Sequence, residues 1–304
     1  MMTCRHCAAP LDLSFVDLGF APPSNAYLTQ DQLHAPELTF PLRVQVCRAC
    51  RLVQTEDYAE ADALFSHDYA YFSSTSKGWL AHARSYAGMI AGRLGLGPQS
   101  HVIEVASNDG YLLRNFVEAE IPCLGIEPTD STANAAEALG IPVLRAFFGE
   151  ALARQLAADG RAADLICGNN VYAHVPDIND FTRGLAAILK PQGVITLEFP
   201  HLAQLLRQTQ FDTIYHEHFS YLSLIAVQRI FAAAGLRIFD VEHLPTHGGS
   251  LRIYGCLESA AHETTQAVAA CLAEERAMGL DTDATYLGFQ SRADAVKDGL
   301  LRFL

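Results

Sequence analysis

The chain has 304 residues, of which 50% are hydrophobic and 18% are charged, so a sizeable core is available and global disorder is excluded. Asp and Glu (34) outnumber Lys and Arg (21), and the formal net charge of −13 argues against a nucleic-acid-binding protein, whose affinity depends on neutralising phosphates. No uncharged apolar run reaches the roughly 18 residues of a membrane-spanning helix, and the first residues carry no apolar secretory signal. We therefore expect a cytoplasmic protein that binds neither nucleic acid nor membrane.

Four of the eight cysteines form two pairs near the start of the chain, Cys4-x-x-Cys7 and Cys47-x-x-Cys50. In a reducing compartment two such pairs predict a structural zinc site, because two intervening residues let both sulfurs reach one ion and four thiolates complete a tetrahedron. A redox dithiol is the alternative, but no thioredoxin-like helix pattern follows the pairs. The region around them, with one predicted strand at 42–46, is too short for a core of its own, so we expect the metal to stabilise it.

From residue 101 onward, short apolar strands alternate with helical patterns. The predicted strands are 102–105, 124–127, 142–144, 164–167 and 194–197, and the predicted helices between them are 111–118, 129–139, 150–157 and 178–189. Such alternation is typical of a parallel, doubly wound α/β sheet. A helix at 224–234 then precedes two consecutive strands, 236–241 and 250–256, which should form an antiparallel edge pair because no helix separates them.

The carboxyl ends of the strands in such a sheet are where a ligand binds. Glu127 closes the second predicted strand, and an acid placed about 20 residues after the first turn can accept hydrogen bonds from ribose hydroxyls. A helix N-cap is the alternative role. Glu104 lies within the first strand. The first turn, Ser107-Asn108-Asp109-Gly110, lacks the glycine-rich loop that cradles a pyrophosphate. We therefore expect a cofactor with a ribose and no phosphate, such as S-adenosylmethionine, rather than a dinucleotide.

Two clusters of polar side chains follow later strands. Asn169 and Asn170 come directly after the strand at 164–167, where unpaired amides are costly, so they are expected to contact a ligand or form a turn. The run Tyr215-His216-Glu217-His218 combines a phenol, two imidazoles and a carboxylate, which favours proton transfer near neutral pH over an ordinary core role. A metal site at His216 and His218 is disfavoured, because side chains at i and i+2 diverge on a helix.

Several further runs complete a recognisable pattern: Glu104-Val105-Ala106-Ser107-Asn108-Asp109-Gly110, Asn169-Asn170-Val171, His174-Val175-Pro176-Asp177, Phe211-Asp212-Thr213-Ile214-Tyr215-His216-Glu217-His218 and His247-Gly248-Gly249-Ser250-Leu251-Arg252. Together with the cysteine pairs they resemble the S-adenosylmethionine-dependent C-methyltransferases of deoxysugar biosynthesis, which act on nucleotide-linked 4-keto sugars. The resemblance runs from Cys4 to about Tyr254.

The resemblance implies a class I methyltransferase sheet of the Rossmann-like type, preceded by a small zinc-binding module, and methylation of C3 through an enolate. It implies substrate-site roles for Tyr69, His174, Tyr215, Glu217 and His218. Of these, His218 is the expected base and Tyr215 the alternative. The resemblance and the position of the first turn together imply the following cofactor-binding residues: Glu104, Asn108, Asp109, Gly110, Glu127, Asn169 and Asn170.

We expect three parts: a zinc-binding module at 1–58, a methyltransferase domain at 59–258 and a helical segment at 259–304. Members of the family continue into a full C-terminal domain that helps to hold the nucleotide, so we expect that domain to be truncated here or supplied by a separate chain. Two other functions stay open. One is an O- or N-methyltransferase for another small molecule, and the other is a catalytically silent, cofactor-binding partner protein.

Overall fold

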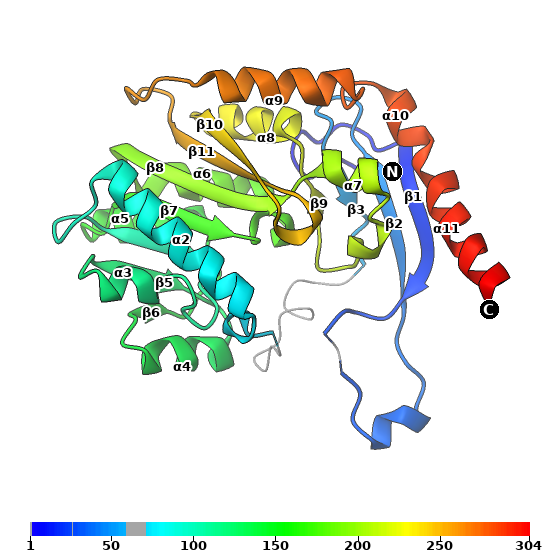
Figure 1. Ribbon diagram of the computed structural model, residues 1–304, viewed down its shortest axis with the longest axis horizontal. Coiled ribbons are helices and arrows are strands. Elements are labelled where there is room, and N and C mark those ends of the chain that lie inside the picture. Colours follow the sequence, from blue (N-terminus) through cyan, green and yellow to red (C-terminus); the bar gives the residue numbers. More distant parts are fainter. Residues whose placement is uncertain (1, 26, 59–70) are drawn as a thin grey trace.

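A seven-stranded sheet lies at the centre of the computed structural model, which describes residues 2–25, 27–58 and 71–304 (Figure 1). Its order is β10-β11-β8-β7-β4-β5-β6. The parallel strands are β4 (Val102–Val105), β5 (Cys123–Ile126), β6 (Val143–Leu144), β7 (Ala163–Asn169) and β8 (Leu189–Pro200). The last two strands, β10 (Leu236–Leu244) and β11 (Ser250–Leu257), pair antiparallel with each other, and β11 also pairs antiparallel with β8. This confirms the predicted doubly wound sheet with its antiparallel pair.

Helices cover both faces of this sheet. On one face pack α2 (Lys77–Leu94), α3 (Arg114–Glu118) and α4 (Asp130–Ala138), and on the other α5 (Glu150–Ala158), α6 (Ile178–Ile188) and α8 (Leu224–Ala233). The central parallel strands are buried on both sides and therefore consist mainly of apolar residues, with few polar exceptions such as Glu104, rather than alternating between apolar and polar. Burial of these two faces builds two of the three core clusters in the described part of the chain.

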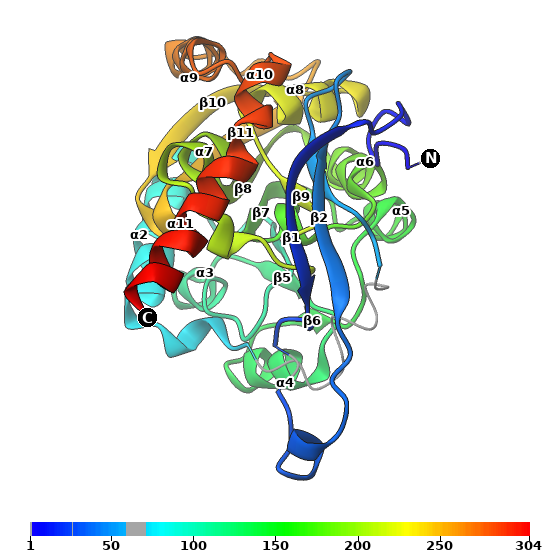
Figure 2. The same cartoon turned by 90° about the vertical axis from the view of Figure 1, so that its right-hand side faces the viewer.

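A second, smaller sheet joins the start of the chain to a distant segment. Its strands are β1 (Leu13–Ala21), β2 (Phe40–Val46), β3 (Val53–Thr55) and β9 (Ser220–Tyr221), all antiparallel. The loop between β1 and β2 carries the 3-10 helix η1 (Asp31–His34) and projects from the body (Figure 2). Because β9 begins two residues after His218, this sheet connects the cysteine-bearing module to the polar cluster at 215–218.

The small sheet packs its apolar face against helices from later parts of the chain. These helices are α7 (Leu202–Gln208), α10 (Asp283–Leu287) and α11 (Phe289–Phe303), and together with the sheet they form one hydrophobic core. Phe289 stacks on Phe15 of β1 at 4.3 Å between ring centroids, and Tyr286 meets the same ring edge-on. The segment after β11 therefore packs against the N-terminal module, and α9 (Gln266–Ala277) packs along α8 and β10. Within the ranges that the structure describes, no helix has the length and apolar character needed to cross a bilayer.

Four 3-10 helices complete the described elements that surround the site: η2 (Ser73–Thr75), η3 (Tyr172–His174), η4 (Phe211–Thr213) and η5 (Thr246–Gly248). The helix predicted at 111–118 begins only at Arg114, since Tyr111, Leu112 and Leu113 still form tight turns after Gly110. Gly110 has φ +77°, and a Cβ there would lie 2.3 Å from Ile141, so glycine is required by both conformation and space.

Candidate active site and metal centre

The four cysteines of the two N-terminal pairs lie together, with all four sulfurs within 4.8 Å of one another. Cys4 and Cys50 are 3.5 Å apart, and Cys7 and Cys47 are 3.4 Å apart. A tetrahedral zinc ion with Zn–S bonds of about 2.3 Å holds its sulfurs about 3.8 Å apart. The spacing therefore fits a closed structural zinc site.

The surroundings of these sulfurs also suit thiolates. The side-chain amide of Gln54 donates to Sγ of Cys4 at 3.2 Å, and the backbone N–H of Cys50 donates to Sγ of Cys47 at 3.5 Å. The hydrogen bond between Cys4 and Cys50 lowers the pKa of Cys4 to about 4 and raises the pKa of Cys50, so without an ion this pair holds one thiolate and one thiol. A site with four thiolates leaves no coordination position for a substrate, so the metal would hold structure rather than take part in the reaction.

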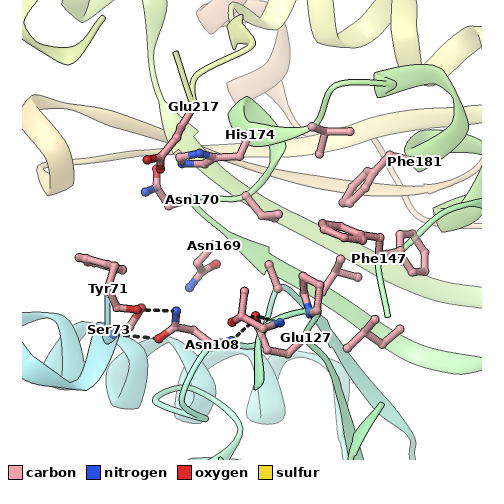
Figure 3. A pocket seen from close by; sticks show the side chains of 18 of the residues that line it. Tyr71, Ser73, Asn108, Glu127, Phe147, Asn169, Asn170, His174, Phe181 and Glu217 are labelled. Atoms are coloured by element: carbon pink, nitrogen blue, oxygen red, sulfur yellow. Dashed lines mark hydrogen bonds between the residues drawn. The ribbon is translucent and has the colours of Figure 1, made fainter. Parts of the chain in front are cut away.

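A cavity of about 520 Å³ opens at the carboxyl ends of β4, β5 and β7. Figure 3 shows that its polar side chains fall into two groups, with Asn169 between them. Asn108, Glu127, Tyr71 and Ser73 lie along one side, whereas Asn170, His174 and Glu217 lie across from them. The cavity thus has room for a cofactor on one side and an acceptor on the other.

Glu127 lines the cofactor side and is already hydrogen bonded. Its Oε2 accepts from the backbone N–H of Asn108 at 2.9 Å, while Oε1 accepts from the N–H and the hydroxyl of Thr129 at 3.0 and 2.5 Å. The carboxylate therefore fixes the first turn and the entry to α4. An ionised carboxylate has about four acceptor positions, so one remains on Oε2 for a ligand hydroxyl.

The two asparagines at the carboxyl end of β7, Asn169 as its last residue and Asn170 directly after it, carry the clearest sign of a bound molecule. Both amide atoms of Asn169 and Oδ1 of Asn170 are buried and have no hydrogen-bond partner in the described part of the chain. Both residues line the cavity. Since buried polar groups are nearly always paired, these atoms fit a ligand that fills the cavity.

The other expected cofactor residues lie behind the wall rather than on it: Glu104, Asp109 and Gly110 are not among the residues that line the cavity. Glu104 is fully buried in β4, and burial raises the pKa of its carboxyl well above the usual range. Asp109 accepts from the backbone N–H of Ser74 at 3.0 Å. Asn108 binds the same segment through the N–H of Ser73 and the carbonyl of Tyr71. Direct cofactor contacts by Glu104, Asp109 and Gly110 stay a prediction.

On the acceptor side, Tyr215 and His218 form a pair. The Tyr215 hydroxyl lies 2.8 Å from Nε2 of His218, and Nδ1 of His218 lies 2.9 Å from the carbonyl of Thr213. A carbonyl only accepts, so Nδ1 carries the hydrogen and Nε2 accepts from the phenol. Tyr215 lines the main cavity, whereas His218 lies behind it and lines a much smaller pocket.

Burial keeps both members of this pair uncharged. It lowers the pKa of His218 well below the usual range and raises the pKa of Tyr215, with the nearby Glu217 as a second cause for the phenol. His174 packs edge-on against His218 at 4.5 Å, and burial lowers its pKa to about 4. The structure therefore brings four of the five expected substrate-site residues together: His174, Tyr215, Glu217 and His218. Tyr69 lies outside the described residues.

The N-terminal module contributes to the wall of the cavity, which sequence reasoning missed. Ser24 and Asn25 donate to Oε1 of Glu217 at 2.7 and 2.9 Å, and both line the cavity. These residues follow a Pro-Pro pair that reads as an ordinary loop. No local pattern in the sequence indicates that this loop reaches a carboxylate almost two hundred residues away.

His247 is a second residue of the wall without a predicted role. It adopts a left-handed conformation, with φ 50°, at the start of a run of three positive-φ residues that ends at Gly249. Its ring meets Trp79 edge-on at 4.9 Å and makes no hydrogen bond to the described part of the chain. The Thr246 hydroxyl anchors the turn on the buried Glu198 at 2.8 Å. Strained backbone of this kind is often found at functional sites, and the His-Gly-Gly run is the signal that could have pointed to it.

Three family models match consecutive parts of the chain. A zinc-binding domain matches residues 4–65, a methyltransferase domain matches 80–241, and a C-methyltransferase C-terminal domain matches 245–304. The last match does not support the expectation that a separate chain supplies a missing C-terminal domain. The segment concerned carries α9, α10 and α11, which pack on β10 and β1 as an integral part of the fold.

Individual relatives agree with these matches. The chain is 36% identical to the C-methyltransferase NovU of Streptomyces niveus over 97% of its own length and 70% of that protein. It is 28% identical to an uncharacterised methyltransferase of Mycobacterium leprae over 32% of this chain and 36% of that one. Among solved structures, the PH0226 protein of Pyrococcus horikoshii superposes with a TM-score of 0.50 at 13% identity, over 66% of this chain and 100% of that one, which shows a shared fold alone.

Proposed function

This chain belongs to the family of S-adenosylmethionine-dependent C-methyltransferases with an N-terminal zinc-binding domain, and we propose that its methyl acceptor is C3 of a nucleotide-linked 4-keto deoxysugar. The family membership confirms the predicted enzyme class and its two cofactors. The acceptor rests on the resemblance of the sequence motifs and on the chemistry of the cavity, and it remains a proposal.

The observation that carries this proposal is the Tyr215–His218 pair at the cavity. A saturated carbon has no lone pair, so it must lose a proton before it can accept a methyl group. A neighbouring ketone makes that proton acidic, because the charge is delocalised onto the carbonyl oxygen. An acceptor of this kind requires a base beside the carbon and donors beside the oxygen. Bound S-adenosylmethionine supplies the electrophilic methyl group.

The arrangement of the pair suggests the path of the proton. As the C3–H bond breaks, its electron pair moves into the ketone. The proton passes to the phenolic oxygen of Tyr215, and the phenolic proton passes to Nε2 of His218. The 2.8 Å hydrogen bond already points in this direction, and Nδ1 of His218 stays fixed on the carbonyl of Thr213. His218 is thus the final proton acceptor, while Tyr215 is the group that touches the substrate.

The other polar side chains on this side have roles in binding. His174 faces the cavity and is a candidate donor to the developing enolate oxygen, since a neutral imidazole can donate a hydrogen bond. Glu217, held by Ser24 and Asn25, can accept from a hydroxyl of the sugar. His247 also lines the cavity, beside Trp79, and its ring nitrogens suit a further contact with the acceptor. All three side chains are polar and can form hydrogen bonds, as the binding of a sugar requires.

Exchange of the C3 proton with solvent deuterium tests this proposal without methyl transfer. With S-adenosylhomocysteine bound in place of the methyl donor, the enzyme should catalyse deuterium uptake at C3 of the acceptor. Both Tyr215→Phe and His218→Asn should lose at least 99% of that exchange, because each variant breaks the proton path. Tyr172→Phe is the matched control, since Tyr172 is a buried phenol that bonds Thr182 and does not line the cavity.

Two results would separate the alternatives. If exchange persists in Tyr215→Phe and vanishes in His218→Asn, the imidazole takes the proton directly. If the parent enzyme methylates a hydroxyl or amine acceptor without any exchange at carbon, the proposal of a carbon acceptor is wrong, and an O- or N-methyltransferase is the better description.

A further inference from the structure

We propose that Arg5, which lies inside the first cysteine pair, is a positioning residue for methyl transfer that ties together the two segments carrying His174 and the Tyr215–His218 pair. The inference rests on the proposed function for its activity measurement only. Its structural part concerns how the zinc-binding module holds the acceptor side of the cavity in shape.

Arg5 reaches the segment after β7 directly. Its Nη1 donates to the carbonyl of Pro176 at 2.9 Å. Pro176 follows His174 by two residues, and both line the cavity. A second contact lies three residues further along the chain, where the side-chain amide of Asn179 donates to the backbone carbonyls of Arg5 and His6 at 3.2 and 2.8 Å. The first cysteine pair is therefore fastened to the segment 174–179 at two points, Pro176 and Asn179.

The same guanidinium also holds the segment that carries the pair. Its Nη2 donates to the carbonyl of Thr55 at 3.0 Å, and its carbon lies 5.3 Å from the centre of the Phe219 ring. Thr55 in turn donates through its hydroxyl to the carbonyl of His218 at 3.2 Å and through its N–H to the carbonyl of Phe219 at 3.2 Å. Pairing of β3 with β9 continues this connection at Gln54 and Ser220.

One planar cation thus spans two segments that are about forty residues apart in the sequence. The Arg5 side chain is only 8% exposed, and its remaining ion pair with Asp57 at 2.8 Å lies at the rim, where that carboxylate is 55% exposed. A lysine ammonium is a single point with three donors and cannot reproduce this fork of contacts or the stacking on Phe219. The geometry therefore requires arginine rather than positive charge alone.

The metal site fixes the backbone from which Arg5 extends. The N–H of Arg5 donates to Oε1 of Gln54 at 2.9 Å, while the amide of the same Gln54 donates to Sγ of Cys4. With Cys4 and Cys7 both held by one ion, the backbone of Arg5 and His6 between them has little freedom. The zinc site would thereby order the acceptor side of the cavity without touching the substrate.

The second cysteine pair contains a natural control. Arg48 follows Cys47 as Arg5 follows Cys4, but its guanidinium meets Asp12 and Asp283 at 3.2 and 3.5 Å and is half exposed. Neither partner lines the cavity. Loss of Arg48 removes the same charge from the same kind of position without releasing either segment.

The test compares Arg5→Met, Arg5→Lys and Arg48→Met in the full chain. Zinc content, affinity for S-adenosylhomocysteine, steady-state methyl transfer, and hydrogen–deuterium exchange of peptides covering 170–180 and 213–222 are measured for each. We expect Arg5→Met to keep zinc and cofactor affinity within twofold, to lower kcat at least tenfold, and to exchange faster in both peptides. Arg5→Lys should be intermediate, and Arg48→Met should match the parent.

The inference is overturned if Arg5→Met retains parental kcat and peptide exchange, or if Arg48→Met changes both as strongly. If Arg5→Met loses zinc, Arg5→Lys takes its place in the comparison with Arg48→Met. The inference is then overturned if Arg5→Lys retains parental kcat and peptide exchange, or if Arg48→Met changes both as strongly. A parent enzyme that methylates none of the proposed acceptors would refute the proposed function, and the peptide exchange would still confirm or refute the positioning role.

Discussion

Replacing Glu127 tests the cofactor side of the site most sharply. The carboxylate accepts three hydrogen bonds within the chain, one from Asn108 and two from Thr129, so the structure leaves a single acceptor position on Oε2 for a ribose hydroxyl. One charge-assisted hydrogen bond contributes about 1.5–3 kcal/mol. At about 1.4 kcal/mol for each factor of ten, Glu127→Gln should weaken S-adenosylhomocysteine about 10- to 150-fold.

The same substitution should also lower the stability of the free protein. A glutamine amide turns one of its two ends into a donor, which must then face the N–H of Asn108 or of Thr129. An N–H left without its acceptor costs about 1–3 kcal/mol. Urea unfolding in the absence of cofactor measures this loss separately from the loss of binding.

Isothermal titration calorimetry with S-adenosylhomocysteine is the assay for affinity. Glu137→Gln serves as the control, because Glu137 lies on α4, is 45% exposed and pairs with Arg145 rather than with the cavity. An affinity of Glu127→Gln within twofold of the parent would refute the ribose contact. Equal weakening in Glu137→Gln would show that the loss comes from net charge and not from the bond.

Three further predictions follow from the metal site, the strained turn and the buried imidazoles. Freshly purified, reduced protein should contain about one zinc per chain by elemental analysis, and Cys7→Ser should hold less than half of that, because three thiolates no longer close the tetrahedron. His247→Gly should keep the free energy of unfolding within about 1 kcal/mol, since glycine avoids the left-handed strain of roughly 1–2 kcal/mol. Turnover of this variant should fall at least tenfold, and unchanged turnover would show that the ring has no role. Burial lowers the pKa values of His174 and His218, so the unfolded chain binds more protons below about pH 6.5. The free energy of unfolding should therefore fall from pH 6.5 towards pH 4, by up to about 1.4 kcal/mol per pH unit for each imidazole. Urea titrations at several pH values measure this dependence. If His174→Gln leaves the dependence on pH unchanged, the buried imidazole is not its cause.

The central sheet could be predicted from the sequence because its signals are local. Strands β4, β5 and β7 are buried on both faces and read as short apolar runs, and each is followed by a helical pattern. The cysteine pairs and the two asparagines at the carboxyl end of β7 were predictable for a similar reason, since spacing or position alone indicates a ligand. These features need no knowledge of distant contacts.

The parts that could not be predicted depend on long-range contacts. Strand β9 has two residues and exists only because Ser220 and Tyr221 pair with β3, far away in the chain. Ser24 and Asn25 enter the site only because the N-terminal module packs beside Glu217. The left-handed conformation of His247 likewise depends on the turn around it; histidine is enriched in this conformation, but only a few per cent of non-glycine residues adopt it, so the residue type alone does not predict it.

The most direct test of the account is methyl transfer itself, with zinc-loaded enzyme, S-adenosylmethionine labelled with deuterium in its methyl group, and a set of nucleotide-linked 4-keto deoxysugars. Mass spectrometry detects the transfer, and NMR locates the labelled methyl group on the product. The account predicts that the label is attached to C3, and that Tyr215→Phe transfers none. A labelled methyl on oxygen or nitrogen, or no transfer to any of these sugars by enzyme that binds the cofactor, would contradict it.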